Sequence, residues 1–392
     1  MRNGLKVFIL ALTLAWIFPV HAEKTSVVER LPAFSWDRVP RYMHIRKDTA
    51  FSADEIRYLA SFPLVTFEKY TGNKDFGSPE AGTLAAARGV KAINPATKVL
   101  YYRNVIVHYG GYAADAALTN VTNAFLVGKD NNDKLVRGRV QAYDLANPKV
   151  RDWWVANAKQ VCADPAIDGL FLDGNVKVLE PTYLLGELGK AKKEGVVEGY
   201  SSMVAETRKA LGPEKLMIAN VLRARFADSG MSRLRAFDGS YIEAFETTVG
   251  KIPVKDYVAK GIAAFQEAAR QGHVIAFTAG MGEEGPEGGK ANEARTDEIR
   301  TGLKNDQASE RRFQYILALF LICAEKHSYF CAHDGYDAKK STQWLKPRPE
   351  FERPLGAPKG PAVRKGYTYT REFEHVSVCV DIEQKTARID WK

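Results

Sequence analysis

The chain has 392 residues, of which 45% are hydrophobic and 11% aromatic, and its formal net charge is +9. This length and composition are sufficient for one large domain with a substantial core. The basic residues form no continuous block, so the mild positive charge does not indicate a nucleic-acid-binding protein. After the first 22 residues, no stretch is long enough and apolar enough to span a membrane.

The first 22 residues are typical of a secretory signal peptide. Arg2 and Lys6 precede an apolar run from Val7 to Phe18, and a segment ending in Ala22 follows. About twelve apolar residues are too few to cross a bilayer, which needs roughly 20. We therefore expect cleavage after residue 22 and export to the periplasm or the cell exterior. Removing two basic and no acidic residues lowers the net charge from +9 to +7.

From residue 41 onward, short β-rich runs alternate with longer helical patterns, which is typical of repeated βα units. Strands are predicted at residues 41–46, 64–69, 98–102, 169–172, 216–220, 239–244, 273–278 and 328–332. Helices are predicted at residues 52–61, 81–92, 148–161, 199–211, 254–270 and 308–326. Ser52 followed by Glu55 is a capping box that marks the start of the first helix. Eight strands with intervening helices predict an α/β fold, a (β/α)8 TIM barrel over residues 23–345.

Three further segments depart from the βα pattern. The connections at residues 105–141 and 279–307 are long and follow strand ends, so in a barrel they lie on the active-site face and shape the cleft. Residues 347–361 contain five prolines, and residues 366–392 alternate like strands around a turn at 383–385. We expect residues 346–392 to form a Pro-rich connection and a small C-terminal β-hairpin appendage packed on the barrel.

Two acidic residues end buried strands two repeat units apart. Asp173 follows the apolar run at residues 169–172, and Glu243 follows the run at residues 240–242. The carboxyl ends of parallel barrel strands share one face, so the two carboxylates are predicted to face each other across the mouth. Glycoside hydrolysis needs such a pair, in which one carboxylate attacks or activates water and the other protonates the leaving oxygen. A helix-cap or ion-pair role for each acid remains the alternative.

Other strand ends carry polar side chains suited to holding a sugar. The predicted substrate-binding residues all lie near the carboxyl end of a strand: His44, Glu68, Tyr102, Arg103, Asn104, Asn220, Tyr241, His333 and Asp334. Together they predict a mouth crowded with hydrogen-bonding groups, and the tyrosines can stack on sugar faces. Trp153 and Trp154, in contrast, lie within a helical run and are predicted to pack against the barrel.

Signatures of several other protein classes are missing from the sequence. It has no P-loop, no Gly-x-Gly-x-x-Gly after the first strand and no His-Glu-x-x-His, so neither a nucleotide nor a zinc cofactor is expected. No Gly-x-Ser-x-Gly is present, which argues against an esterase. The cysteines match no metal-binding spacing, and both disulfides and buried free thiols are compatible with them: Cys162, Cys323, Cys331 and Cys379.

Several short motifs resemble those of glycosyl hydrolase-like family fifteen. They are residues 101–104, Tyr143-Asp144 with Asn147-Pro148, residues 151–154, Phe-Leu-Asp-Gly at 171–174 and Tyr-Ile-Glu-Ala-Phe at 241–245. Residues 369–374 are similar to a small β appendage seen in such proteins. More distantly, the chain resembles endo-α-1,4-polygalactosaminidases and α-galactosidase-like barrels. This resemblance implies a TIM barrel with Asp173 as the nucleophile after the fourth strand and Glu243 as the general acid/base after the sixth.

The hypothesis is therefore an exported glycoside hydrolase that cleaves a polysaccharide or oligosaccharide with retention and uses no metal or cofactor. One alternative is a non-catalytic carbohydrate-binding barrel, in which the acids only hydrogen-bond to sugar hydroxyls. Another is a polysaccharide lyase, which needs a base and a positive group that neutralises a uronic acid. Arg103, Arg223 and His333 make a lyase possible, and fold alone does not decide among the three.

Overall fold

The computed structural model describes residues 30–282 and 306–392. The predicted signal peptide and most of the long connection at residues 279–307 lie outside the described residues. None of the helices within the described part is long and apolar enough to cross a membrane.

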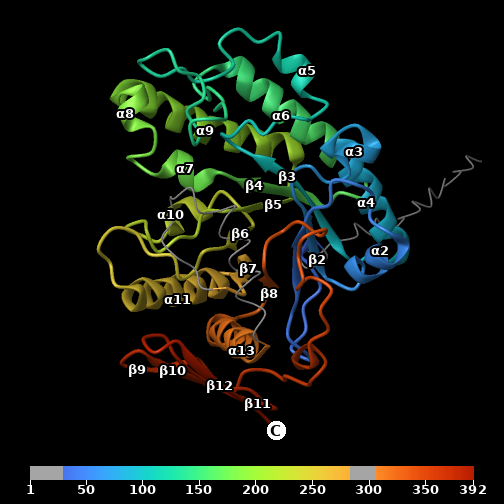
Figure 1. Cartoon of the computed structure of the whole chain (residues 1–392), viewed down its shortest axis with the longest axis vertical. Helices are drawn as coiled ribbons and strands as arrows, with labels where there is room; N and C mark the ends of the chain where they lie inside the picture. Colours follow the sequence, from blue (N-terminus) through green and yellow to red (C-terminus); the bar gives the residue numbers. More distant parts are fainter. Residues whose placement is uncertain (1–29, 283–305) are drawn as a thin grey trace, which may run out of the picture.

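Eight parallel strands form one sheet in sequence order (Figure 1). They are β1 (Tyr42–Ile45), β2 (Leu64–Phe67), β3 (Lys98–Asn104), β4 (Gly169–Asp173), β5 (Leu216–Ala219), β6 (Gly239–Ile242), β7 (Val274–Gly280) and β8 (Ser328–His333). Parallel bridges from Arg41 to Phe330 and from Arg46 to Asp337 bring the first and last strands together and nearly close the barrel. Each predicted strand overlaps an observed one, and the predicted (β/α)8 barrel is confirmed.

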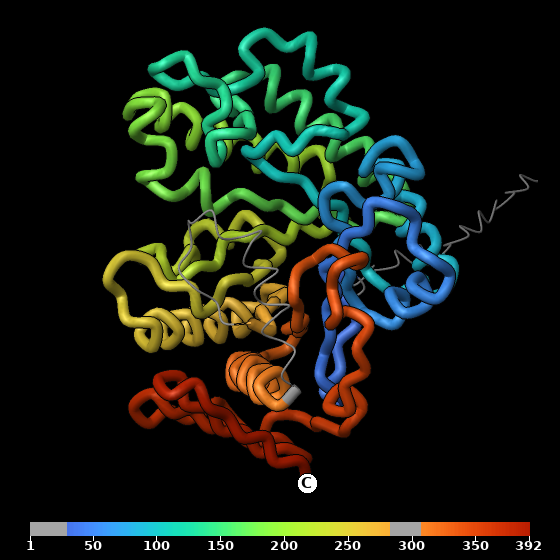
Figure 2. Tube along the Cα trace, in the orientation of Figure 1, coloured from blue at the N-terminus to red at the C-terminus, as the bar shows by residue number. Residues whose placement is uncertain are grey.

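Helices cover the outside of this barrel, and all six predicted helices are present (Figures 1 and 2). The long ones are α4 (Pro79–Ile93), α6 (Pro148–Cys162), α9 (Lys190–Leu211), α11 (Val254–Arg270) and α13 (Asp306–Cys323), and α2 (Ala53–Leu59) begins with the predicted capping box. Short helices lie in the loops: α3 (Asn73–Phe76), α5 (Asp115–Leu118), α7 (Asn175–Leu179), α8 (Leu185–Leu188) and α10 (Met231–Leu234). The short ones occur mostly after strand ends, on the mouth side of the barrel.

Strand alternation decides which side chains enter the barrel. One buried cluster fills the interior and contains residues from alternate positions, such as Tyr42, Phe171 and Tyr329. The residues between them, such as Met43 and Leu170, belong to the larger core under the helices. Since side chains on a strand alternate between its two faces, the residue two positions beyond an interior one faces the barrel axis again, at the mouth.

Two buried tryptophans and the buried Cys162 lie on α6, and the buried Cys323 ends α13. Trp153 and Trp154 are in the core between α6 and β3, as predicted, and the Trp154 indole donates to the Asn104 carbonyl oxygen at 3.0 Å. All four cysteines lie among the described residues, and all four are free thiols there. Burial raises the pKa of Cys162 to about 12, which keeps that thiol protonated and unreactive.

The predicted C-terminal β appendage is confirmed and is larger than a hairpin. It is a four-stranded antiparallel sheet of β9 (Val363–Lys365), β10 (Thr368–Glu372), β11 (Val376–Asp381) and β12 (Thr386–Trp391), in the order β12-β11-β10-β9. The sheet lies against α13 (Figure 1). Three or more strands with a covered apolar face are stable where a lone hairpin is marginal, and α13 provides the cover.

Arg371 of β10 fastens the appendage to the barrel. Its buried guanidinium donates to the carbonyl oxygen of Leu321 at 3.2 Å and to that of Ala324, and it pairs with Glu325 at 3.1 Å. These acceptors lie at the carboxyl end of α13, where helix carbonyls lack intrahelical partners and a cation is favourable. The guanidinium thus caps a barrel helix from a different structural unit.

Replacing Arg371 by Met should lower the free energy of unfolding by roughly 3 kcal/mol, because buried carbonyls and Glu325 lose their partner. Arg388→Met is the matched control, since Arg388 lies on β12 and its side chain is 76% exposed. The control should change stability by no more than about 0.5 kcal/mol. Urea titration of both variants measures the difference, and equal effects would contradict a capping role for Arg371.

Candidate active site

Asp173 is the last residue of β4 and is held by donors from the neighbouring strand β3. Its Oδ2 accepts hydrogen bonds from the Tyr102 hydroxyl at 2.6 Å and from the Asn104 side-chain nitrogen at 3.2 Å. Burial alone would raise its pKa, but the charge of Lys69 and the Tyr102 hydrogen bond outweigh burial and hold the pKa of Asp173 below its ordinary value. Asp173 is therefore ionised at neutral pH.

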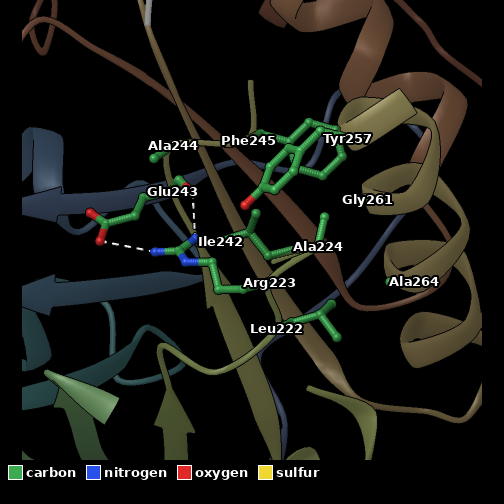
Figure 3. A pocket seen from close by; sticks show the side chains of 10 residues that line it. All are labelled: Leu222, Arg223, Ala224, Ile242, Glu243, Ala244, Phe245, Tyr257, Gly261 and Ala264. Atoms are coloured by element: carbon green, nitrogen blue, oxygen red, sulfur yellow. Dashed lines mark hydrogen bonds and ion pairs between the residues drawn. The ribbon is translucent and has the colours of Figure 1, made fainter. Parts of the chain in front are cut away.

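Glu243 directly follows β6 and carries the second carboxylate. Its Oε1 accepts from Arg223 at 3.0 Å and from the Asn220 side-chain nitrogen at 2.8 Å. Figure 3 shows the Arg223 guanidinium reaching Glu243 from the next strand end. The Glu243 side chain remains 34% exposed. Solvent and ligand can therefore reach this carboxylate.

Asn220 lies between the two acids and bonds both of them. Its side-chain nitrogen is 3.2 Å from Asp173 Oδ1 and 2.8 Å from Glu243 Oε1. Two oxygens that share one donor cannot lie further apart than these two lengths combined. Such a short separation of the nearest oxygens is compatible with the roughly 5 to 5.5 Å between the carboxyl groups of retaining glycosidases, whereas the groups of inverting ones lie roughly 6.5 to 9.5 Å apart.

The chain turns sharply after each acid. Gly174 has φ of 81° and Ala244 has φ of 50°, so both adopt the left-handed conformation. A Cβ on Gly174 would lie 2.5 Å from Asn104 Oδ1, so only glycine fits beside that side chain. Ala244 pays the usual strain of a non-glycine residue in this conformation, which is typical of functional sites.

His44 and Glu68 also face the barrel axis. His44 Nδ1 lies 2.9 Å from the Tyr42 hydroxyl, which donates onward to Thr66, so Nδ1 carries the imidazole proton and Nε2 is an acceptor. Burial lowers the pKa of His44 to about 4, and the imidazole is neutral above that pH. The buried Glu68 pairs with Lys69 and, at 3.4 Å, with Arg46.

Tyr241 and His333 line the side of the mouth next to Glu243. The Tyr241 hydroxyl lies 3.4 Å from Glu243 Oε2 and 2.5 Å from the Tyr336 hydroxyl, and Tyr336 lies 3.1 Å from His333 Nε2. Burial lowers the pKa of His333 to about 4, so this imidazole is also neutral at physiological pH. These two predicted residues are thus connected to the acid pair by hydrogen bonds.

Two predicted substrate-binding residues do not join this cluster. Arg103 lies between Tyr102 and Asn104 on β3 and so points to the outer face, with its guanidinium 4.4 Å from the Tyr112 ring and 5.1 Å from that of Trp153. Asp334 is buried and accepts from Ser341 and from the Thr342 backbone nitrogen at 2.8 Å, so it holds the loop after β8. Neither the Asp334 carboxylate nor the Arg103 guanidinium is therefore available to a ligand in the mouth.

Lys69, the last residue of the predicted strand at 64–69, also lies in the mouth. Its ammonium pairs with Glu68 and lies 5.2 Å from the Tyr102 ring and 4.9 Å from the Tyr109 ring. It also supplies the positive charge that stabilises Asp173 as a carboxylate. Neighbouring residues Glu68 and Lys69 thus meet one another at the rim, which alternation along a straight strand would not predict.

A separate small pocket lies behind Glu243 (Figure 3). Glu243 and Arg223 border it on one side, and Phe245, Tyr257 and Gly261 on the other. Asp173 does not line it, so this pocket between β6 and α11 is not the space between the two acids. Within residues 30–282 and 306–392, no group of three or more His, Cys, Asp or Glu side chains could hold a metal ion.

The model of hypothetical glycosyl hydrolase family 15 matches residues 91–377, which is well over half of the chain. The chain belongs to this family. It is a glycoside hydrolase, and its substrate is a carbohydrate. The resemblance that the short motifs indicated is thereby confirmed. No curated protein matches the chain.

Solved structures that resemble the chain are also glycosidases. The glycoside hydrolase domain of PelA from Pseudomonas aeruginosa is 15% identical over 67% of this chain and 90% of that chain, with a TM-score of 0.41. An α-amylase from Anoxybacillus is 10% identical over 89% of this chain and 88% of that one, with a TM-score of 0.50. The α-galactosidase TtGalA from Thermus thermophilus is 15% identical over 91% and 69%, with a TM-score of 0.45. At such identities the likeness concerns the fold alone.

Replacing Gly174 by Ala should displace Asn104 from Asp173, in addition to straining the backbone. The matched control is Gly212→Ala, because Gly212 has φ of 76° but nothing within 4 Å of the added Cβ. The control should lower the free energy of unfolding by about 1–2 kcal/mol, because alanine is strained in the left-handed conformation. Gly174→Ala should cost clearly more and reduce turnover, as measured by urea unfolding and by assay. Equal costs with unchanged turnover would show that Asn104 does not need this glycine.

His44 should make stability depend on pH. Its pKa falls from 6.5 in the unfolded chain to about 4 in the fold, so the unfolded state binds more protons between these values. The stability that neutral His44 contributes is complete above pH 6.5 and is lost as the pH falls toward 4, on the order of 3 kcal/mol. The stability difference between wild type and His44→Asn should therefore shrink by that amount from pH 7 to pH 4. Urea titrations across this range measure it, and a constant difference would refute it.

Proposed function

We propose that this glycosidase is a retaining enzyme in which Asp173 is the nucleophile and Glu243 the general acid/base. The observation that carries the proposal is the single Asn220 nitrogen that bonds both carboxylates, at 3.2 and 2.8 Å. A short separation of the two acids favours retention, because an inverting enzyme needs space between its carboxyl groups for a water molecule.

The surroundings of the two acids support this division of roles. Asp173 accepts several hydrogen bonds and has a lowered pKa, which suits a group that must be ionised to attack. Glu243 is 34% exposed, which suits a group that must exchange protons with a leaving group and with water. Exchanging the roles would make a proton donor of the carboxyl group whose pKa is held below its ordinary value.

In the first step, an Asp173 oxygen attacks the anomeric carbon while the glycosidic carbon–oxygen bond breaks. The proton of Glu243 passes to the departing oxygen, which leaves as a hydroxyl. In the second step, Glu243 takes a proton from water, the water oxygen bonds the anomeric carbon, and the bond to Asp173 breaks. Two displacements restore the original anomeric configuration.

The two alternatives find less support in the site. A lyase needs a positive group at the substrate carboxylate, yet Arg103 points away from the mouth and Arg223 is engaged with Glu243. A purely binding barrel has no need for two acids that share one donor. We further propose export of the enzyme, on the basis of the predicted signal peptide, and a polysaccharide or oligosaccharide as substrate.

Asp173→Asn and Glu243→Gln should each lower turnover by about three orders of magnitude or more while leaving the fold intact, because each removes one half of the carboxylate pair. The assay is mass spectrometry of fragments from a panel of bacterial, algal and plant polysaccharides. Fragments heavier by one water per cleavage, with retained configuration by proton NMR, are expected from wild type.

Glu246→Gln is the matched control for that experiment. Glu246 lies three residues beyond Glu243, but it is buried and pairs with Arg312 of α13 at 2.5 Å, away from the acid pair. Its replacement should reduce stability and change turnover only a few-fold. Unsaturated products that absorb ultraviolet light would indicate a lyase, and glycan binding without any cleavage would indicate a binding protein. Near-normal turnover of Asp173→Asn would refute the proposed nucleophile.

A further inference from the structure

We infer that His333, Tyr336 and Tyr241 form a hydrogen-bonded relay whose donors point toward Glu243 and hold its carboxylate in position to deliver a proton to the leaving group. This inference rests on the proposed acid/base role of Glu243. It assigns Tyr241 and His333, which the sequence suggested as sugar ligands, a positioning role instead.

The direction of the relay is fixed at its far end by His333. The Gly335 backbone N–H donates to His333 Nδ1 at 3.2 Å, so Nδ1 is the acceptor nitrogen. A neutral imidazole has one donor and one acceptor nitrogen, and the proton therefore resides on Nε2. Nε2 lies 3.1 Å from the Tyr336 hydroxyl and donates to it.

The two tyrosine hydroxyls carry this direction onward. Each has a single proton, so Tyr336, which accepts from His333, donates to the Tyr241 oxygen at 2.5 Å. Thr278 is a weaker acceptor for Tyr336, at 3.5 Å. Tyr241 in turn donates to Glu243 Oε2 at 3.4 Å. All donors therefore point toward the carboxylate.

Ring contacts hold the relay in place. His333 and Tyr336 stack with centroids 4.4 Å apart, and the His44 ring lies 4.7 Å from Tyr336 and 5.0 Å from Tyr241. Phe171 packs edge-on against Tyr241 at 5.0 Å. Tyr241 is only 2% exposed, and a hydrogen bond is electrostatically stronger in such a dry setting than in water.

The two oxygens of Glu243 consequently have different surroundings. Oε1 faces Arg223 and the shared Asn220, and Asp173 lies across the mouth. Oε2 faces the Tyr241 hydroxyl. The negative charge of Glu243 contributes to the raised pKa values of Tyr241, Tyr336 and Tyr42. Arg223 pairs with Oε1, and the relay ends on Oε2.

If Tyr336 were to turn and donate to His333 Nε2, that nitrogen would have to pass its proton to Nδ1, where the Gly335 N–H already points. The His333 end therefore favours the direction that runs toward Glu243. A hydrogen bond donated to Oε2 stabilises the carboxylate more than the carboxylic acid, so the relay makes Glu243 a stronger acid.

The test measures the pKa of Glu243 directly, by carbon-13 NMR titration of protein labelled at glutamate carboxyls, with its signal assigned by its loss in Glu243→Gln. Tyr241→Phe removes the last donor and should raise this pKa by about one unit. Tyr336→Phe does not touch Glu243 and should raise it by a smaller amount, a few tenths of a unit. His333→Gln, whose amide can accept as well as donate, should also raise it.

Tyr329→Phe is the matched control, because Tyr329 is another barrel-interior tyrosine whose hydroxyl donates to the Pro32 carbonyl oxygen at 2.8 Å, away from the acids. It should leave the pKa of Glu243 unchanged. A Tyr241→Phe value equal to the control would overturn the relay, and a Tyr336→Phe value equal to the control would overturn its extension beyond Tyr241.

Activity gives a second readout on the polysaccharide found in the product analysis. The alkaline limb of the pH–rate profile reports the acid, so it should move upward in Tyr241→Phe by the same amount as the measured pKa. If wild type cleaves the polysaccharide and the pKa of Glu243 is unchanged in the variants, the relay is contradicted and the proposed function is unaffected. A pKa change in a protein that cleaves nothing would retain the relay's geometry but remove the acid/base role that the inference assigns to it.

Discussion

The site depends on keeping two carboxylates close together in the mouth of a barrel. Two like charges about 5 Å apart repel by about 3 kcal/mol at an effective dielectric constant of 20. Asn220 offsets part of this by donating to both, while Lys69 stabilises Asp173 and Arg223 pairs with Glu243. Each of these groups comes from a different strand end, and the closed sheet is what brings them within reach of one another.

Much of this arrangement could be predicted, because it follows from strand period. The eight apolar runs of the sequence predicted the strands of the barrel. Phe171 and Ile218 face the barrel interior, and Asp173 and Asn220 lie two positions further along and face the same way. The prediction that Arg103 binds substrate did not take into account the alternation of side chains along its strand. The arginine lies one position out of phase with Tyr102 and Asn104, so alternation along β3 places it under α6 among the rings of Tyr112 and Trp153.

What the sequence could not supply depends on loops that fold back on the barrel. Asp334 directly follows β8, but its partners Ser341 and Thr342 come from a loop whose path no local pattern reveals. The same loop places Tyr336 between His333 and Tyr241. The hydrogen bond between Tyr336 and Tyr241 joins residues 95 positions apart in the sequence. The size of the C-terminal sheet was hidden similarly, since β9 follows the proline-rich connection and pairs as an edge with β10.

The neutral state of the two histidines follows from the same burial and has a chemical consequence. A protonated His44 or His333 would be a titrating cation beside the acids, and its charge would change in the pH range where a glycosidase works. Burial lowers both pKa values to about 4, so at higher pH the positive charge beside the acids comes from groups such as Lys69 and Arg223, whose charge is constant. Each neutral imidazole keeps its proton on one nitrogen. His333 can therefore accept a hydrogen bond from the Gly335 N–H and donate one toward Tyr336. A protonated imidazole has two donors and could not accept from that N–H.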